Sequence, residues 1–215
     1  MKHFLLLLLP VFAAVVTKAQ SPQYQDAMTK QVGLLDVPAS YNPQSMLDIS
    51  NTFERIAAAE KNQWLPYYYA AYSQVMSALM TQDKDKIDGL ADKAEANINK
   101  ADSLKQNDDE VACIRSLIAS SRIMVDPQTR GQQYGPESGM QIQKAKQINP
   151  ENPRVYLLEG QALYYTPEQF GGDKAKAKEV LQVALQKYAA FKPASSIAPH
   201  WGEPHAKDLL QQAGK

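Results

Sequence analysis

The chain has 215 residues, of which 23 are basic and 23 are acidic, so its formal net charge is zero. This balance gives no reason to expect a nucleic-acid partner or an anionic membrane surface. Hydrophobic residues make up 44% of the chain, which allows a sizeable core, and the length suits one domain or one array of repeats.

The first 19 residues have the layout of a secretory signal peptide. A short basic start, "MKH", precedes the apolar stretch "FLLLLLPVFAAVV", and "TKA" then forms a small-x-small cleavage pattern before Gln20. We expect a mature protein that begins at Gln20, lies in the periplasm or outside the cell, and has no transmembrane span after cleavage. An uncleaved membrane anchor is the alternative, and the lack of a cysteine near the cut excludes a lipoprotein.

Helical periodicity runs through the remaining sequence, and the alternating β-branched runs that are typical of strands do not appear. Helices joined by short polar turns predict an all-α fold of antiparallel helical hairpins. We predict helices over residues 23–36, 45–61, 64–80, 84–105, 109–125, 136–148, 153–165, 173–191 and 203–212.

The segment "VDPQTRGQQYGPE", from Val125 to Glu137, is predicted to be a loop between two of these helices. Long loops are often functional, so Arg130 and Tyr134 are candidate functional residues. The alternative is a loop that folds back over the helix ends.

Cys113 is the only cysteine, so the exported chain has no internal disulfide and depends on packing for its stability. Its apolar surroundings, "VACIRSLI", favour a small buried hydrophobic residue over a nucleophile. A nucleophilic thiol would need a histidine base, and the mature chain has only His200 and His205, both far away in sequence.

Several junctions between predicted helices share a small or apolar residue, a polar break and an immediate helix restart. In the clearest one, "KAKQINPENPRVY", Ala145 precedes Pro150, and Tyr156 and Gly160 then stand one helical turn apart. These features resemble the tetratricopeptide repeat family, in which a proline ends helix B and the following helix A carries an aromatic residue and then a glycine. The resemblance implies that the neighbouring helix B crosses close to the backbone at Gly160.

This resemblance implies a right-handed superhelix of stacked hairpins over residues 20–192, followed by a Pro-rich segment and a C-terminal capping helix over 193–215. Trp201 is expected to cover the open end of the last helix pair. Corresponding junction positions are 45, 44 and 39 residues apart, which are the spacings along Ile56, Ala101, Ala145 and Ala184. The family repeat has about 34 residues, so we expect longer helices or loops here. A stack of generic helical hairpins is the alternative.

By the same resemblance, side chains of the A helices line a concave groove that binds a partner. These groove positions are Leu65, Tyr68, Tyr72, Met76, Cys113, Leu117, Ser121, Arg154, Leu157, Gln161 and Tyr165. Arg154 is the only charge among them, and tyrosines suit a binding surface because they offer a large area and a hydroxyl. The alternative is that the aromatics pack in the core. In the groove, Tyr68→Ala and Tyr72→Ala are expected to cost less stability than Phe53→Ala.

Two further patterns are candidate ligand sites. A glycine pair before a helix, as in "FGGDK", could cradle an anion, but it lacks the ending of a P-loop, and Asp173 fits a helix N-cap better. His200, Glu203 and His205 lie close in sequence and could hold zinc, but their spacing matches no metal motif.

The sequence contains no Ser/His/Asp set, no facing carboxylate pair and no nucleotide fingerprint, so we expect no catalytic residue, metal or cofactor. It predicts a non-enzymatic, periplasmic or secreted scaffold that binds a protein or peptide partner in its groove. The alternative is a carrier of a small ligand or metal ion that uses the groove aromatics or the segment of His200 and His205. An enzyme with an unrecognised site is a third possibility.

Overall fold

The computed structural model describes residues 21–214, so the predicted signal peptide lies outside the described residues. Within this range the chain is all-helical and has no strand, which confirms the predicted fold class, and no helix there has the length and apolar character to cross a membrane. The helices are α1 (Pro22–Gly33), α2 (Pro43–Ala59), α3 (Trp64–Met80), α4 (Lys84–Leu104), α5 (Asp109–Ile123), α6 (Pro127–Ile148), α7 (Pro153–Tyr165), α8 (Lys174–Ala190) and α9 (Glu203–Ala213). Three short 3-10 turns are η1 (Leu34–Asp36), η2 (Pro38–Ser40) and η3 (Glu168–Phe170).

Polar side chains set the starts of these helices. Asn42, Asp126 and Asn152 stand just before α2, α6 and α7, and each accepts a hydrogen bond from a backbone N–H of the first turn. A proline follows each cap as the first helical residue, where its missing N–H costs nothing. Asp173 caps α8 by accepting from the backbone N–H of Lys176, as predicted.

The predicted loop over Val125–Glu137 is wrong, because most of it forms the first half of α6, which continues through Pro136. Contacts with other helices hold this half in place. Arg130 donates two hydrogen bonds to Asp88 of α4, at 2.7 and 2.9 Å. The Ser138 hydroxyl also lies 2.8 Å from a serine hydroxyl of α5. The cap at Asp126 and these contacts together stabilise the segment as a helix, and Arg130 is part of an interhelical ion pair.

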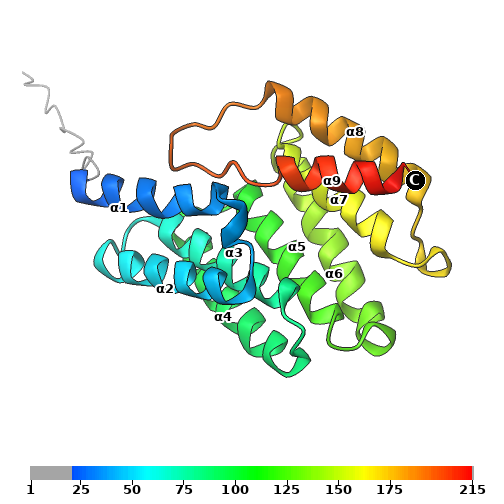
Figure 1. Cartoon of the computed structure of the whole chain (residues 1–215), viewed down its shortest axis with the longest axis horizontal. Coiled ribbons are helices and arrows are strands. Elements are labelled where there is room, and N and C mark those ends of the chain that lie inside the picture. Colours follow the sequence, from blue (N-terminus) through cyan, green and yellow to red (C-terminus); the bar gives the residue numbers. More distant parts are fainter. Residues whose placement is uncertain (1–20, 215) are drawn as a thin grey trace, which may run out of the picture.

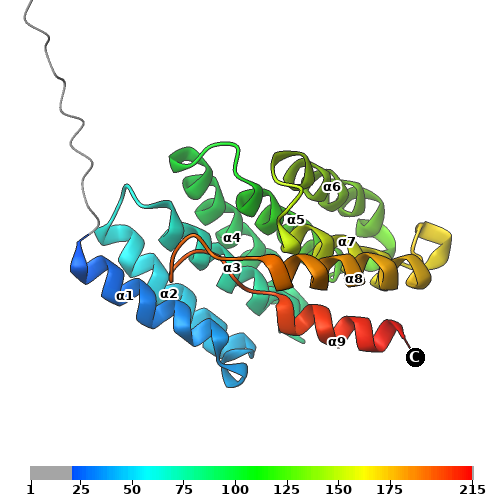
Figure 2. The same cartoon turned by 90° about the horizontal axis from the view of Figure 1, so that it is seen from above.

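Helices adjacent in the sequence pack as pairs, α3 with α4, α5 with α6 and α7 with α8. In addition α3 contacts α5, and α5 contacts α7, so these three helices form an inner row (Figure 1). Seen from above, α4 and α6 lie on one side of the inner row, and α1 and α9 lie on the other (Figure 2). The inner row therefore has one covered side, and one side that is flanked by the two ends of the chain.

Gly160 marks a close crossing between α7 and α8. A Cβ atom built on Gly160 would lie 2.7 Å from Cγ and 2.9 Å from Cδ2 of Leu181. Real Cβ atoms do not make contacts this short, so a larger residue would push the two helices apart. The expected close approach at Gly160 is confirmed.

Candidate functional site

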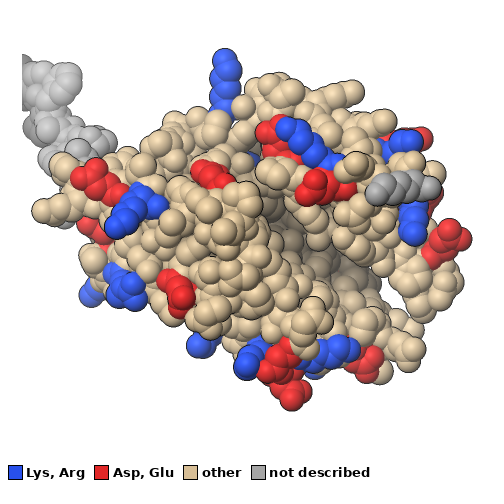
Figure 3. Space-filling view, viewed as in Figure 1, with Lys and Arg blue, Asp and Glu red and all other residues tan. Residues whose placement is uncertain are grey.

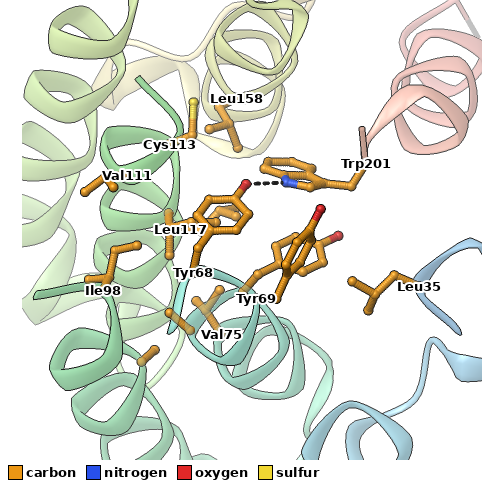
Figure 4. Packing of buried hydrophobic residues seen from close by; sticks show 14 of the residues in the cluster. Leu35, Tyr68, Tyr69, Val75, Ile98, Val111, Cys113, Leu117, Leu158 and Trp201 are labelled. Carbon is orange, nitrogen blue, oxygen red and sulfur yellow. Dashed lines mark hydrogen bonds between the residues drawn. The ribbon is translucent and has the colours of Figure 1, made fainter. Parts of the chain in front are cut away.

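The N-terminal ends of the inner row meet around a buried ion pair. Glu110 of α5 and Arg154 of α7 are both buried, and Arg154 Nε donates to the two carboxylate oxygens at 2.8 and 3.0 Å. The hydroxyl of Tyr68 on α3 donates to Glu110 at 2.9 Å, and Trp201 Nε1 donates to the Tyr68 hydroxyl at 2.7 Å (Figure 4). Burial raises the pKa of Glu110, while the neighbouring guanidinium opposes that rise. The cluster joins three helices and the C-terminal segment.

Most of the predicted groove lining is buried in the core. The buried members are Leu65, Tyr68, Tyr72, Cys113, Leu117, Ser121, Arg154 and Leu157. Met76 and Gln161 are half-buried, and Tyr165 is 59% exposed. A buried side chain cannot touch a partner in this conformation, so Tyr165 is the member of the set that solvent reaches most.

Arg154 was expected to be the one charge of an open groove, and the structure corrects this. Its guanidinium pairs with Glu110 and lies 4.7 Å from the ring centroid of Phe191 and 5.8 Å from that of Trp201. Sequence reasoning missed Glu110, whose partner is distant in the chain. Cys113 is also buried, and burial raises the pKa of its thiol well above the usual range, as befits a small core residue.

Residues 191–202 form a strap that covers this end of the inner row. The Tyr69 hydroxyl donates to the carbonyl of Ile197 at 3.0 Å, and the ring of Trp201 stacks on that of Tyr72 with centroids 4.9 Å apart. Trp201 was expected to cover the last helix pair. In the structure its ring also packs against Tyr72 of α3. The strap thus helps to bury Tyr68, Tyr69 and Tyr72 of α3.

The histidine segment shows no metal cluster. His200 Nδ1 lies 2.8 Å from the carbonyl oxygen of Ala198, and its Nε2 lies 3.1 Å from a carboxylate oxygen of Asp36 in η1. Both ring nitrogens are therefore engaged, and Glu203 pairs with Lys207 at 2.7 Å. Among residues 21–214, no three His, Cys, Asp or Glu side chains are grouped so that they could hold a metal ion.

The C-terminal half of α7 borders a deep hollow in the molecular surface. Figure 3 shows this hollow over α6 and α7 and below α9, and comparison with Figure 1 identifies these helices. Its walls in this view carry no lysine, arginine, aspartate or glutamate, and the charged side chains gather at its edges. An uncharged concavity of this kind is suited to an apolar ligand.

Three glycines leave α6 bare on the side that faces α7. Gly131, Gly135 and Gly139 lie at four-residue steps, so they share one helix face, and no atom lies within 4 Å of a Cβ built on any of them. The same face carries Lys146, whose ammonium donates to Glu159 of α7 at 2.9 Å. The two helices therefore touch near Lys146 and diverge toward the glycines, which opens the hollow.

Aromatic side chains lie at the C-terminal end of α7, which borders the hollow. Tyr165 follows Arg154, Leu158 and Gln161 at steps of four and three, so it extends the face of α7 that meets α5. Phe170 lies in the next turn and is 64% exposed. The hollow is thus bordered by the glycines of α6 and lies close to the exposed aromatic side chains at the end of α7.

No protein-family model and no curated protein matches the sequence. Among solved structures, the HusA haemophore from Porphyromonas gingivalis is similar, with 40% sequence identity and a TM-score of 0.80. The alignment covers 91% of this chain and 94% of that chain. This chain belongs to the HusA haemophore family. Membership of the tetratricopeptide family, for which no family model matches, stays a prediction.

Proposed function

We propose that the protein is an exported, non-enzymatic carrier of haem. The observation that carries the proposal is its 40% identity to the HusA haemophore over 91% of this chain. Haem is a flat, largely apolar macrocycle with two carboxylate side groups, and an uncharged hollow with exposed aromatic side chains near its edge suits such a ligand. The proposal favours the small-ligand carrier over the scaffold that binds a protein or peptide.

The packing of the helices supports a finer architecture for this carrier. We infer that the hairpins α3–α4, α5–α6 and α7–α8 follow one another as in a tetratricopeptide superhelix. The contacts within the inner row and the crossing at Gly160 support this order. In that arrangement the hollow is a site where the last two hairpins diverge.

Export rests on the signal-like N-terminus, which the structure does not describe. The mature protein is expected to begin at Gln20 and to be found outside the cytoplasm. An intact-mass spectrum of the exported protein tests this, and retention of Met1 in exported material would contradict it.

Titration of haemin into the mature protein, followed by absorbance of the bound macrocycle and by calorimetry, tests the function. We expect saturable binding, and we expect Gly135→Leu to weaken it because the new side chain enters the hollow. A weakening of about fivefold or more is expected, since steric overlap of this size costs on the order of 1–3 kcal/mol. Gly89→Leu is the matched control, because Gly89 is an exposed helical glycine of α4 with no atom within 4 Å of its Cβ position.

The two results separate function from location. No saturable haemin binding by the wild-type protein would contradict the carrier function. Equal haemin affinity of the wild type and Gly135→Leu would be consistent with the carrier function, but would show that haem binds outside the hollow.

A further inference from the structure

An aromatic rim stands where α7 turns into α8, and we define it as Tyr164, Tyr165, Phe170 and Lys174. Tyr165 is 59% exposed and Phe170 is 64% exposed. The rings of Tyr164 and Tyr165 meet edge to face with centroids 5.0 Å apart. The turn lies beside the hollow, as comparison of Figures 1 and 3 shows.

The backbone holds Phe170 in its exposed position. The backbone N–H groups of Phe170 and Gly172 both donate to the carbonyl of Pro167, at 2.9 and 3.2 Å. Gly171 adopts a left-handed conformation with φ of 93°, and a Cβ at Gly172 would lie 1.7 Å from the carbonyl oxygen of Thr166. The turn therefore needs both glycines, and its tight hydrogen bonding presents a large apolar side chain to water.

A cation accompanies the exposed rings. The Lys174 ammonium lies 5.4 Å from the ring centroid of Tyr164, and among the described side chains it pairs with this ring and with no carboxylate. Exposed aromatic planes next to an available ammonium match a ligand that is both flat and anionic. A purely apolar ligand would offer no anionic group to pair with the Lys174 ammonium.

We propose that the aromatic rim is a contact surface for the cargo of this carrier, and this inference rests on the proposed haem-binding function. Tyr165 and Phe170 pack against the plane of the tetrapyrrole, and Lys174 pairs with one of its carboxylates. The macrocycle then spans from the bare face of α6 to the rim, with its charged edge toward solvent. The rim thus selects planar aromatic anions.

The first test compares haemin affinity in Tyr165→Ala, Phe170→Ala and the control Met140→Ala. Met140 is also 64% exposed, but it lies on α6 away from the face of the buried Ser138 and Ile142. Each rim variant is expected to bind haemin about three- to tenfold more weakly, as for the loss of one aromatic contact, and the control within about twofold of the wild type. Phe170→Trp is expected to keep wild-type affinity, because it retains an aromatic ring at this position.

The outcomes of this test are distinct. Failure of the wild type to bind haemin would defeat the carrier function, and the rim inference with it. If the wild type binds and either rim variant keeps wild-type affinity, or if Met140→Ala weakens binding as much, the rim inference alone is overturned. Light scattering that shows a wild-type dimer dissociated by Phe170→Ala would assign the rim to a second copy of the chain, and would also overturn it.

The second test addresses the charge. Lys174→Gln is expected to weaken binding of a dicarboxylate porphyrin about three- to tenfold, and to leave binding of its dimethyl ester unchanged. Lys176→Gln is the matched control, because Lys176 is an exposed lysine of the same helical turn. Equal weakening for the acid and the ester, or an equal effect of the control, would overturn the pairing with Lys174.

Discussion

The two ends of the inner row differ in almost every respect. At their N-terminal ends, α3, α5 and α7 converge on the buried pair of Glu110 and Arg154, which the strap and Trp201 cover. Toward the C-terminal end of α7, the last two hairpins diverge, and exposed aromatics and bare glycines border a hollow. The difference is largest along α7, whose first residues are buried and whose last residue, Tyr165, is exposed.

The largest expected effect is on the closed end. Arg154→Met leaves Glu110 buried without its partner, and the free energy of unfolding is expected to fall by about 3–5 kcal/mol. The double variant Glu110→Gln with Arg154→Met is expected to lose less than the sum of the two single changes. Urea unfolding measures all of these, and a loss below about 1 kcal/mol for Arg154→Met would contradict the importance of the pair.

The tyrosines of α3 give the next test, and the structure reverses the expectation that their truncation is mild. Tyr68 and Phe53 both have an exposed fraction of 0%. Tyr68→Ala is therefore expected to destabilise the fold by about 3–5 kcal/mol, as much as Phe53→Ala, since both remove a large core ring. Urea unfolding of the two variants side by side decides this. A clearly smaller loss of unfolding free energy for Tyr68→Ala than for Phe53→Ala would instead support a place for Tyr68 in the groove.

The glycines of the two regions are expected to respond in opposite ways. Gly160→Leu pushes against Leu181, so its free energy of unfolding is expected to drop by about 1–3 kcal/mol through overpacking. Gly89→Leu, with open space around it, is the control and is expected to lose nothing. If Gly160→Leu were neutral in urea titrations, the crossing of α7 and α8 would not be as close as described.

The smallest effect is expected at the open end. Gly135→Ala meets no atom within 4 Å, so it is expected to stabilise α6 by about 0.5–1 kcal/mol through helix propensity. Gly160→Ala is the matched comparison and is expected to gain nothing, because its Cβ would meet Leu181. Thermal unfolding compares the two variants, and a destabilised Gly135→Ala would show that α6 is not bare there.

Most of the helices could be predicted from the sequence alone, because helix starts and ends depend largely on neighbouring residues; the start of α6 is the exception. Caps such as Asn152 and Asp173 act within one turn, and α3 and α7 have the predicted bounds. The close approach at Gly160 was also predictable, since a mid-helix glycine is costly unless something needs the space. The resemblance to a repeat family indicated that the adjacent helix occupies the space beside Gly160.

Only the tertiary structure decided which of these side chains water can reach. Helical spacing places Arg154 and Tyr165 on the same face of α7, and no local rule says that the first is buried by the strap while the second is exposed. The first half of α6 is held against α4 by the ion pair of Arg130 with Asp88, a contact between residues 42 positions apart in the chain. Burial and openness arise from how whole helices converge or diverge, and that depends on contacts between residues that are distant in sequence.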